Sequence, residues 1–129
     1  MRYKTIKILT FVCIMLTWAR DAHSQTTIDS STISTDKQLN FTFTHKRGIK
    51  ADNGIIYLVE KDGQTLTAFD NNEIKWTVNI IKICGQPRAG RPEIRRIMLT
   101  ENEIEITFGK HDFASVEIKD GKVKYLGAD

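Results

Sequence analysis

The last three-fifths of the sequence repeats itself at a period of 49 residues without a gap. Moving the sequence by 49 positions places apolar residues on apolar residues at alternate positions and keeps the turn residues in register. Alternation with a period of two is typical of a strand that buries one face. The chain is therefore expected to contain two copies of one β unit. The matched pairs are Ile55 with Ile104, Tyr57 with Ile106, Val59 with Phe108, Thr67 with Val116, Phe69 with Ile118, Ile74 with Val123 and Trp76 with Tyr125.

Eight strand-like runs, separated by turn signals, follow from residue 39 to the end of the chain. Turns such as Asp62-Gly63 and Asp120-Gly121 predict antiparallel hairpins. The expected fold class is all-β, with two four-stranded antiparallel meanders packed as a small sandwich or barrel. The first unit (39–81) has runs at 39–45, 55–60, 65–70 and 73–81, and the second (94–126) has runs at 94–100, 103–109, 113–118 and 122–126. Residues 82–93, which hold both prolines, form the long loop between the units.

The first copy of the repeat contains a recognisable series of strand and turn residues. It runs Gly54-Ile55-Ile56-Tyr57-Leu58, then Asp62-Gly63, then Leu66-Thr67-Ala68-Phe69-Asp70, and ends at Trp76. This series resembles one blade of the pyrroloquinoline-quinone-type β-propeller repeats. The resemblance implies a blade-like meander in which Trp76 docks neighbouring blades, and it does not imply the quinone cofactor. The second copy diverges, since Glu117, Lys119 and Tyr125 stand at the Ala, Asp and Trp positions.

Residues 1–24 have the three parts of a secretory signal peptide. Three basic residues precede an apolar stretch at 8–19, and the segment ends Ala22-His23-Ser24, with small residues at the −3 and −1 positions. The apolar stretch has about 12 residues, fewer than the roughly 20 that span a bilayer, which argues against a membrane anchor. We expect cleavage after Ser24, no membrane span afterwards, and a secreted or periplasmic protein.

Removal of the signal changes the charge of the chain. Residues 1–24 hold four of the 19 Lys and Arg residues and one of the 16 Asp and Glu residues, so the remainder carries 15 of each. The basic pI therefore belongs to the signal and gives no evidence for a nucleic-acid partner. No aromatic residues alternate with the arginines at 88–96, so no nucleic-acid partner is expected. Residues 25–38 are rich in Ser and Thr, which predicts a flexible leader or, alternatively, a docking edge strand. Cys84 is then the single cysteine, either buried or able to bridge two chains of a homo-oligomer.

The best candidate for a binding surface is the basic loop between the two units. Five basic residues fall within fifteen positions, opposed only by Glu93. Arginines displayed on a proline-bearing loop suit a carboxylate, a phosphate or a sulfated glycan. The alternative is that Arg95 or Arg96 pairs with the acidic run at 101–105 of the neighbouring strand. The five residues are Lys82, Arg88, Arg91, Arg95 and Arg96.

Catalytic and metal-binding patterns are sparse in this sequence. His111-Asp112 could act as a base with its orienting carboxylate, but geometry rather than adjacency defines such a dyad, and a polar turn is the simpler interpretation. The carboxylates of Glu101, Glu103 and Glu105 share one strand face, which fits a cation site or, more commonly, a solvated surface. No catalytic residue, metal site or cofactor is therefore predicted.

Aromatic residues recur at the repeat spacing. They are expected to form the core and the contact between the two units rather than a ligand site. The expected core residues are Tyr57, Phe69, Trp76, Phe108, Ile118 and Tyr125.

Together these patterns favour an exported, non-enzymatic binding module whose surface is the loop at 82–96. Its partner would be another exported protein or an anionic surface ligand. Two alternatives remain: a small hydrolase-like accessory protein that uses His111 and Asp112, and a structural protomer of an oligomer. In the oligomer, Cys84 or a sheet edge would form the contact.

Overall fold

The computed structural model describes residues 27–129, so the predicted signal peptide lies outside the described residues. This part of the chain consists of strands with a single 3-10 turn and a single short α-helix. The elements are η1 (Ser30–Thr32), β1 (Ile33–Ser34), β2 (Gln38–Asn40), β3 (Gly48–Lys50), β4 (Ile56–Val59), β5 (Thr65–Asp70), β6 (Glu73–Asn79), α1 (Ile80–Cys84), β7 (Ile94–Leu99), β8 (Glu103–Phe108), β9 (Asp112–Glu117) and β10 (Val123–Ala128).

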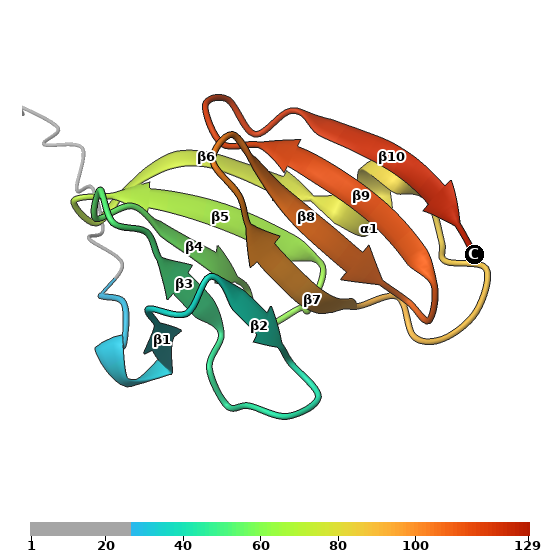
Figure 1. Cartoon of the computed structure of the whole chain (residues 1–129), viewed down its shortest axis with the longest axis horizontal. Helices are drawn as coiled ribbons and strands as arrows, with labels where there is room; N and C mark the ends of the chain where they lie inside the picture. The colour runs from blue at the N-terminus through green and yellow to red at the C-terminus, as the bar shows by residue number, and fades with distance from the viewer. Residues whose placement is uncertain (1–26) are drawn as a thin grey trace, which may run out of the picture.

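The strands form two five-stranded sheets, which are largely antiparallel (Figure 1). In the first sheet, β3, β4, β5 and β6 follow one another as an antiparallel meander. In the second sheet, β7, β8, β9 and β10 do the same. The two meanders correspond at the 49-residue spacing, since Tyr57 of β4 matches Ile106 of β8 and Trp76 of β6 matches Tyr125 of β10. The expected all-β fold is confirmed.

Each sheet also has a fifth strand, so the expected number of four was wrong. β1 pairs in parallel with β3 at one edge of the first sheet, and β2 pairs antiparallel with β7 at one edge of the second. The run at 39–45, expected to begin the first unit, therefore contributes to the second sheet through β2. Leu39 explains this placement, because its buried side chain lies opposite Ile97 of β7 and joins the core there.

Part of the expected leader at 25–38 has regular structure. The side chain of Asp29 accepts a 3.0 Å hydrogen bond from the backbone N–H of Ser31 and so caps η1. β1 then extends the first sheet beside β3. Gly48 of β3 makes close packing possible here, because a Cβ at this position would lie 2.7 Å from the carbonyl oxygen of Tyr57. Residues 33 and 34 thus match the docking edge strand that was the alternative interpretation.

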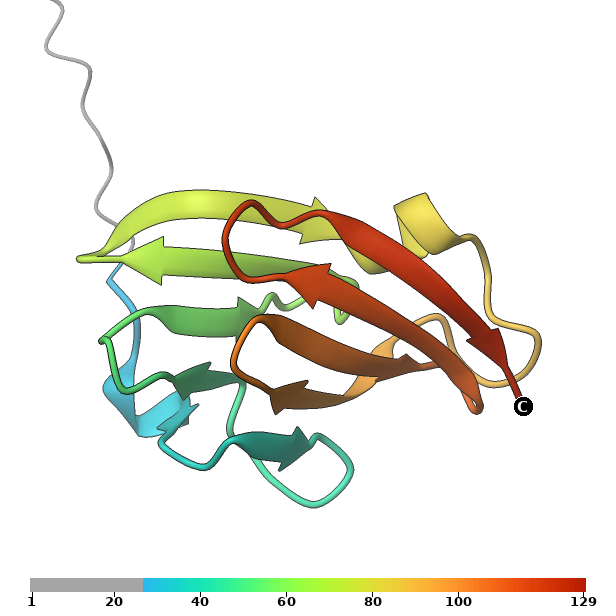
Figure 2. The same ribbon diagram turned by 45° about the horizontal axis from the view of Figure 1, so that its top comes forward.

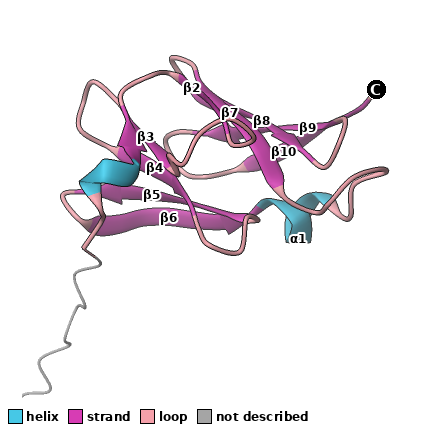
Figure 3. Cartoon of the chain, turned by 90° about the horizontal axis from the view of Figure 1, so that it is seen from below, coloured by secondary structure: helices cyan, strands magenta, loops and turns pink. Residues whose placement is uncertain are grey.

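The two sheets pack against each other as two layers and share one hydrophobic core (Figure 3). Neither a closed barrel nor a propeller forms within residues 27–129, so the barrel alternative was wrong. Each sheet ends in two edge strands instead of closing on itself. The largest fully buried side chains of the core are Tyr57, Phe108, Ile49, Leu66, Ile80, Ile97, Ile104 and Ile106.

The expected core residues differ in their surroundings. Tyr57, Trp76 and Phe108 are buried in the shared core, and half-buried Ile118 packs against its margin. Phe69 and Tyr125 lie outside the shared core. Phe69 is buried but lies on the outer face of the first sheet, where it pairs with Ile56 of β4 and Ile74 of β6. Tyr125 is 44% exposed at the end of the core.

The run at 73–81 does not continue as a strand to its end. The side chain of Asn79 accepts a 2.9 Å hydrogen bond from the backbone N–H of Lys82 and starts α1. Ile80 and Ile81 are buried, which fastens α1 to the core. None of the helices in the described part of the chain has the length and apolar character needed to cross a bilayer.

β6 and β10 are the outer strands of their sheets and run along the same side of the molecule (Figure 2). Each carries an irregularity in its pairing. In β6, Lys75 has no partner residue in the pairing with β5, and in β10, Leu126 has none in the pairing with β9. Bulges and lysines on an edge strand hinder pairing with another chain.

Candidate functional site

The basic loop is fastened to the turn between β8 and β9. The backbone N–H of Lys110 donates to the carbonyl of Ala89 at 2.8 Å, and the N–H of Gly109 donates to the carbonyl of Glu93 at 3.0 Å. Gly109 has a φ of 57° and packs directly under Pro87, where a side chain would overlap the proline ring. The loop is therefore held in a defined place, although it has no regular secondary structure.

A buried carboxylate fixes the start of the same loop. Asp112 is 2% exposed, and one of its oxygens accepts a 3.1 Å hydrogen bond from the backbone N–H of Arg88. Its other oxygen accepts a 2.8 Å hydrogen bond from the hydroxyl of Tyr125. Asp112 thus joins the loop to β9 and β10, which is a structural role.

A groove of about 420 Å³ lies where this loop meets β7 and the segment after β2. Three basic side chains contribute to it, Arg91, Arg95 and Lys110, against the single carboxylate of Glu93. We call it the basic groove. Its lining consists of Phe41, Thr42, Gly90, Arg91, Glu93, Ile94, Arg95, Gly109 and Lys110.

Two arginines at or near the groove contact neighbouring groups of the chain. Arg95 donates from one terminal nitrogen toward the carbonyl oxygens of Gly109 and Lys110, at 3.4 and 3.5 Å, which are long and weak hydrogen bonds. Most of the five guanidinium donors of Arg95 therefore stay free for a ligand. The guanidinium of Arg47 lies 5.0 Å from the centre of the Phe41 ring, within the range of a cation–π interaction.

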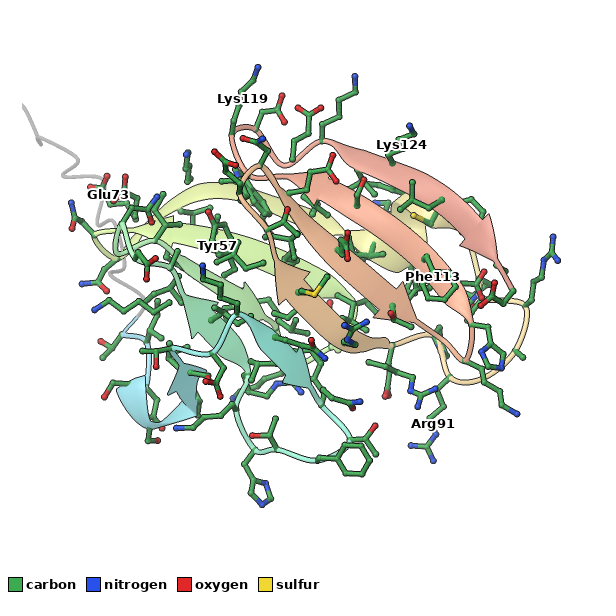
Figure 4. The ribbon with its side chains drawn as sticks, in the orientation of Figure 1. Tyr57, Glu73, Arg91, Phe113, Lys119 and Lys124 are labelled. Atoms are coloured by element: carbon green, nitrogen blue, oxygen red, sulfur yellow. The ribbon has the colours of Figure 1, made fainter. Side chains whose placement is uncertain are left out.

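The five basic residues expected to form one surface are split by the fold. Arg91 and Arg95 lie together in the basic groove, with Arg91 near the bottom of the view in Figure 4. Lys82 is exposed on α1, and Arg88 lies beside Tyr125. Arg96 lies on the outer face of the second sheet, opposite Thr107 rather than opposite a glutamate of the run at 101–105.

Comparison with protein-family models, curated proteins and solved structures found no match.

The suggested His111-Asp112 dyad does not form in the described residues. Both oxygens of Asp112 are engaged, by Arg88 and Tyr125, and no hydrogen bond joins this carboxylate to the imidazole of His111. His111 is exposed on the turn. The hydrogen bond to Asp112, together with burial, raises the pKa of the Tyr125 phenol, so the phenol holds its proton rather than acting as a base.

Cys84 is half-buried and unpaired with any other cysteine of the described chain. Burial and, secondarily, the carboxylate of Asp112 raise the pKa of its thiol. A nucleophilic cysteine needs the opposite shift, since the thiolate is the reactive form. The surroundings of Cys84 therefore favour an inert thiol.

The acidic run also gives no metal centre. Glu103 and Glu105 are exposed on the outer face of β8, whereas Glu101 lies in the turn before this strand. No cluster of three or more His, Cys, Asp or Glu residues among those described is arranged to hold a metal ion.

Two groups of the basic groove did not emerge from sequence reasoning. Lys110 belongs to a turn that approaches the loop only in the folded chain, so no local pattern joined it to Arg91. Phe41 was placed in a strand, but it lies just after β2 and faces the groove. Phe43, two residues further on, is 84% exposed.

Proposed function

We propose that the protein is an exported, non-enzymatic binding module that holds an anionic group of its partner in the basic groove. The observation that carries the proposal is the convergence of Arg91, Arg95 and Lys110 on one groove with only Glu93 against them. Guanidinium groups bind carboxylate and phosphate oxygens through paired hydrogen bonds, which makes such a groove selective for oxyanions.

The groove also has an apolar side, which favours another exported protein as the partner. Phe41 lines it, and strongly exposed Phe43 follows in the same loop. Aromatic residues and arginines are enriched in protein interfaces. An acidic segment that also carries an apolar side chain would use both parts of this surface.

Binding of short probes tests the proposal. Isothermal titration calorimetry would compare an acidic peptide that contains a phenylalanine, the same peptide with its glutamates changed to glutamine, and a heparin oligosaccharide. We expect the acidic peptide to bind and the neutral peptide to bind at least about tenfold more weakly, because one desolvated charged hydrogen bond is worth about 1.5–3 kcal/mol. Tighter binding of heparin than of the peptide would assign the groove to a sulfated glycan instead.

A matched pair of double variants tests whether binding depends on the basic groove or only on the net charge of the protein. Arg91→Ala with Arg95→Ala removes two positive charges from the groove. Lys119→Ala with Lys124→Ala removes two from the opposite side of the molecule, at the top of Figure 4. Only the first pair should abolish peptide binding, and equal losses in both pairs would contradict the proposal.

We also propose that the two meanders are related to a propeller blade, as the resemblance of residues 54–76 implies. Support comes from the four-stranded meander β3–β6 and from Trp76, which lies on its last strand and packs against Gly121 of the second unit. The two units pack face to face, so the relationship would concern the repeat rather than a ring.

A further inference from the structure

A second cavity, of about 380 Å³, lies between the two sheets at the opposite end of β8 from the basic groove. We call it the inter-sheet cavity. Its volume lies toward the lower end of the roughly 300–1,000 Å³ that is typical of small-molecule sites. Its lining consists of Thr35, Lys37, Lys50, Ala51, Asp52, Asn53, Tyr57, Leu99, Thr100, Glu101 and Ile118.

The walls of this cavity come from equivalent parts of the two repeats. Residues 50–53 lie at the end of β3 and in the turn that follows it, and residues 99–101 lie at the end of β7 and in the turn that follows it. The 49-residue spacing that relates the meanders places Asp52 on Glu101. Each unit therefore supplies an equivalent carboxylate to one cavity, which exists only because the two sheets pack together.

Tyr57 is the observation that points to a ligand. Among the described residues that line the cavity it is the only fully buried one, at 1% exposed, and its ring lies 6.0 Å from that of Trp76 in the core. Its hydroxyl makes no hydrogen bond to any residue in the range 27–129. Among the described residues, Arg96 Nε is the only fully buried side-chain nitrogen or oxygen without a partner, so the Tyr57 hydroxyl is open to the cavity and can hydrogen-bond to a molecule that enters it.

The rim of the cavity carries equal numbers of positively and negatively charged side chains. Lys37 and Lys50 supply two cations, and Asp52 and Glu101 supply two anions, all exposed at the entrance. The four charges cancel, so the rim has no net charge that would favour an anion or a cation. Ammonium and carboxylate groups do, however, form strong charge-assisted hydrogen bonds with hydroxyls.

We propose that the inter-sheet cavity binds a small, uncharged, hydroxyl-rich molecule of the sugar class, which hydrogen-bonds to the Tyr57 hydroxyl that faces the cavity and to the charged rim. A sugar hydroxyl both donates and accepts, and the phenol of Tyr57 does the same. This site is independent of the basic groove, and its ligand differs in charge from the acidic partner of the groove.

The test is an NMR titration of the full-length, ¹⁵N-labelled chain with glucose, N-acetylglucosamine, maltose and cellobiose, and with glucuronate and glycine as ionic comparators. We expect at least one neutral sugar to shift the amide signals of residues 50–53, 57 and 99–101 in a saturable way. The ionic comparators should bind more weakly. The proposal is overturned if none of the neutral sugars shifts these signals at millimolar concentration, or if an ion binds more tightly than all of them.

Variants test the named contacts. Tyr57→Phe removes a single oxygen atom and should weaken binding about two- to twelvefold, the effect of one net hydrogen bond. Asp52→Asn with Glu101→Gln alters only exposed side chains, so it tests the rim even if the buried variant folds poorly. Its matched control is Glu105→Gln with Glu117→Gln on the outer face of the second sheet. Unchanged affinity in both the Tyr57 and the rim variants would also overturn the proposal, whereas the control and Arg91→Ala should bind like the wild type.

Discussion

The indole N–H of Trp76 donates a 2.8 Å hydrogen bond to the backbone carbonyl of Ile118, which lies 42 residues further along the chain and just beyond β9. The bond crosses from the first sheet to the second. The ring of Trp76 also covers Gly121, where a Cβ would lie 2.7 Å from the indole. One side chain of the first repeat therefore fixes the position of the last turn of the second.

Replacing Trp76 should loosen the joint between the two units. We expect Trp76→Ala to lower the free energy of unfolding by about 3–5 kcal/mol, the usual loss for a large aromatic core residue. Trp76→Phe should lose about 1–3 kcal/mol, because the carbonyl of Ile118 is left without its donor. Urea unfolding measures both. Exposed Ile74 on the same strand provides the control, and equal stability of Trp76→Ala and Ile74→Ala would contradict the role of the indole.

Gly109→Ala should displace the basic loop. The new methyl group would overlap Pro87, and the φ of 57° disfavours a side chain. We expect a loss of about 1–3 kcal/mol of stability, as for other overpacked sites. The displaced loop should also lower the affinity for the acidic peptide. Gly54→Ala is the control, because that glycine also has positive φ but nothing within 4 Å of its Cβ position. Equal effects of the two substitutions would rule out a specific role for the Pro87 contact.

The fold should become less stable in strongly alkaline solution. Burial raises the pKa of Tyr57, and the hydrogen bond to Asp112 raises the pKa of Tyr125, both above the ordinary tyrosine value of 10.0. The folded chain thus binds these protons more tightly than the unfolded chain. The resulting stabilisation is fully present below the pKa that the tyrosines have in the unfolded chain. It is lost as the pH rises through the higher pKa that they have in the folded chain. Urea unfolding from neutral pH to above pH 10 should show this fall, and Tyr57→Phe with Tyr125→Phe should flatten it. An equally steep fall in the double variant would assign the effect to other groups.

Light scattering should show a monomer with and without reductant. The outer strands β6 and β10 carry bulges at Lys75 and Leu126, which hinder edge-to-edge pairing. Cys84 is half-buried with a raised thiol pKa, so a bridge between chains should form slowly. A mass that doubles only without reductant would identify Cys84 as an assembly contact, and one that doubles under both conditions would identify a sheet edge.

The meanders could be predicted because their signal is local. Alternating apolar residues, such as Tyr57 and Val59 in β4 or Ile104 and Ile106 in β8, mark strands that bury one face, and the positive-φ residues Asn71 and Asn72 mark a tight turn. For the edge strands, a docking strand in the leader was one of two interpretations, but the sheet to which β2 belongs could not be predicted. β2 has three residues, and its assignment to the second sheet depends on Ile97, far away in the sequence.

The candidate sites also have one part that is visible in the sequence and another that forms only when the chain folds. Arg91 and Arg95 stand close in the sequence, so their cluster was visible before folding. Lys110 joins them only in the folded chain, where its turn is hydrogen-bonded to the loop and Gly109 packs under Pro87. The inter-sheet cavity left no mark in the sequence, because Tyr57 has the pattern of a core residue and only the packing of the two turns beside it leaves space at its hydroxyl.

The placement of β1 and β2 in different sheets has a consequence for the order in which the chain assembles. A chain made from its N-terminus produces Leu39 early, yet Leu39 has no partner until Ile97 of β7 has been made. β2, one of the earliest strands to be made, is thus among the last to find its partner, whereas β1 needs only β3. Any fragment that ends before β7 leaves β2 as an unpaired, partly apolar strand, a target for aggregation or proteolysis.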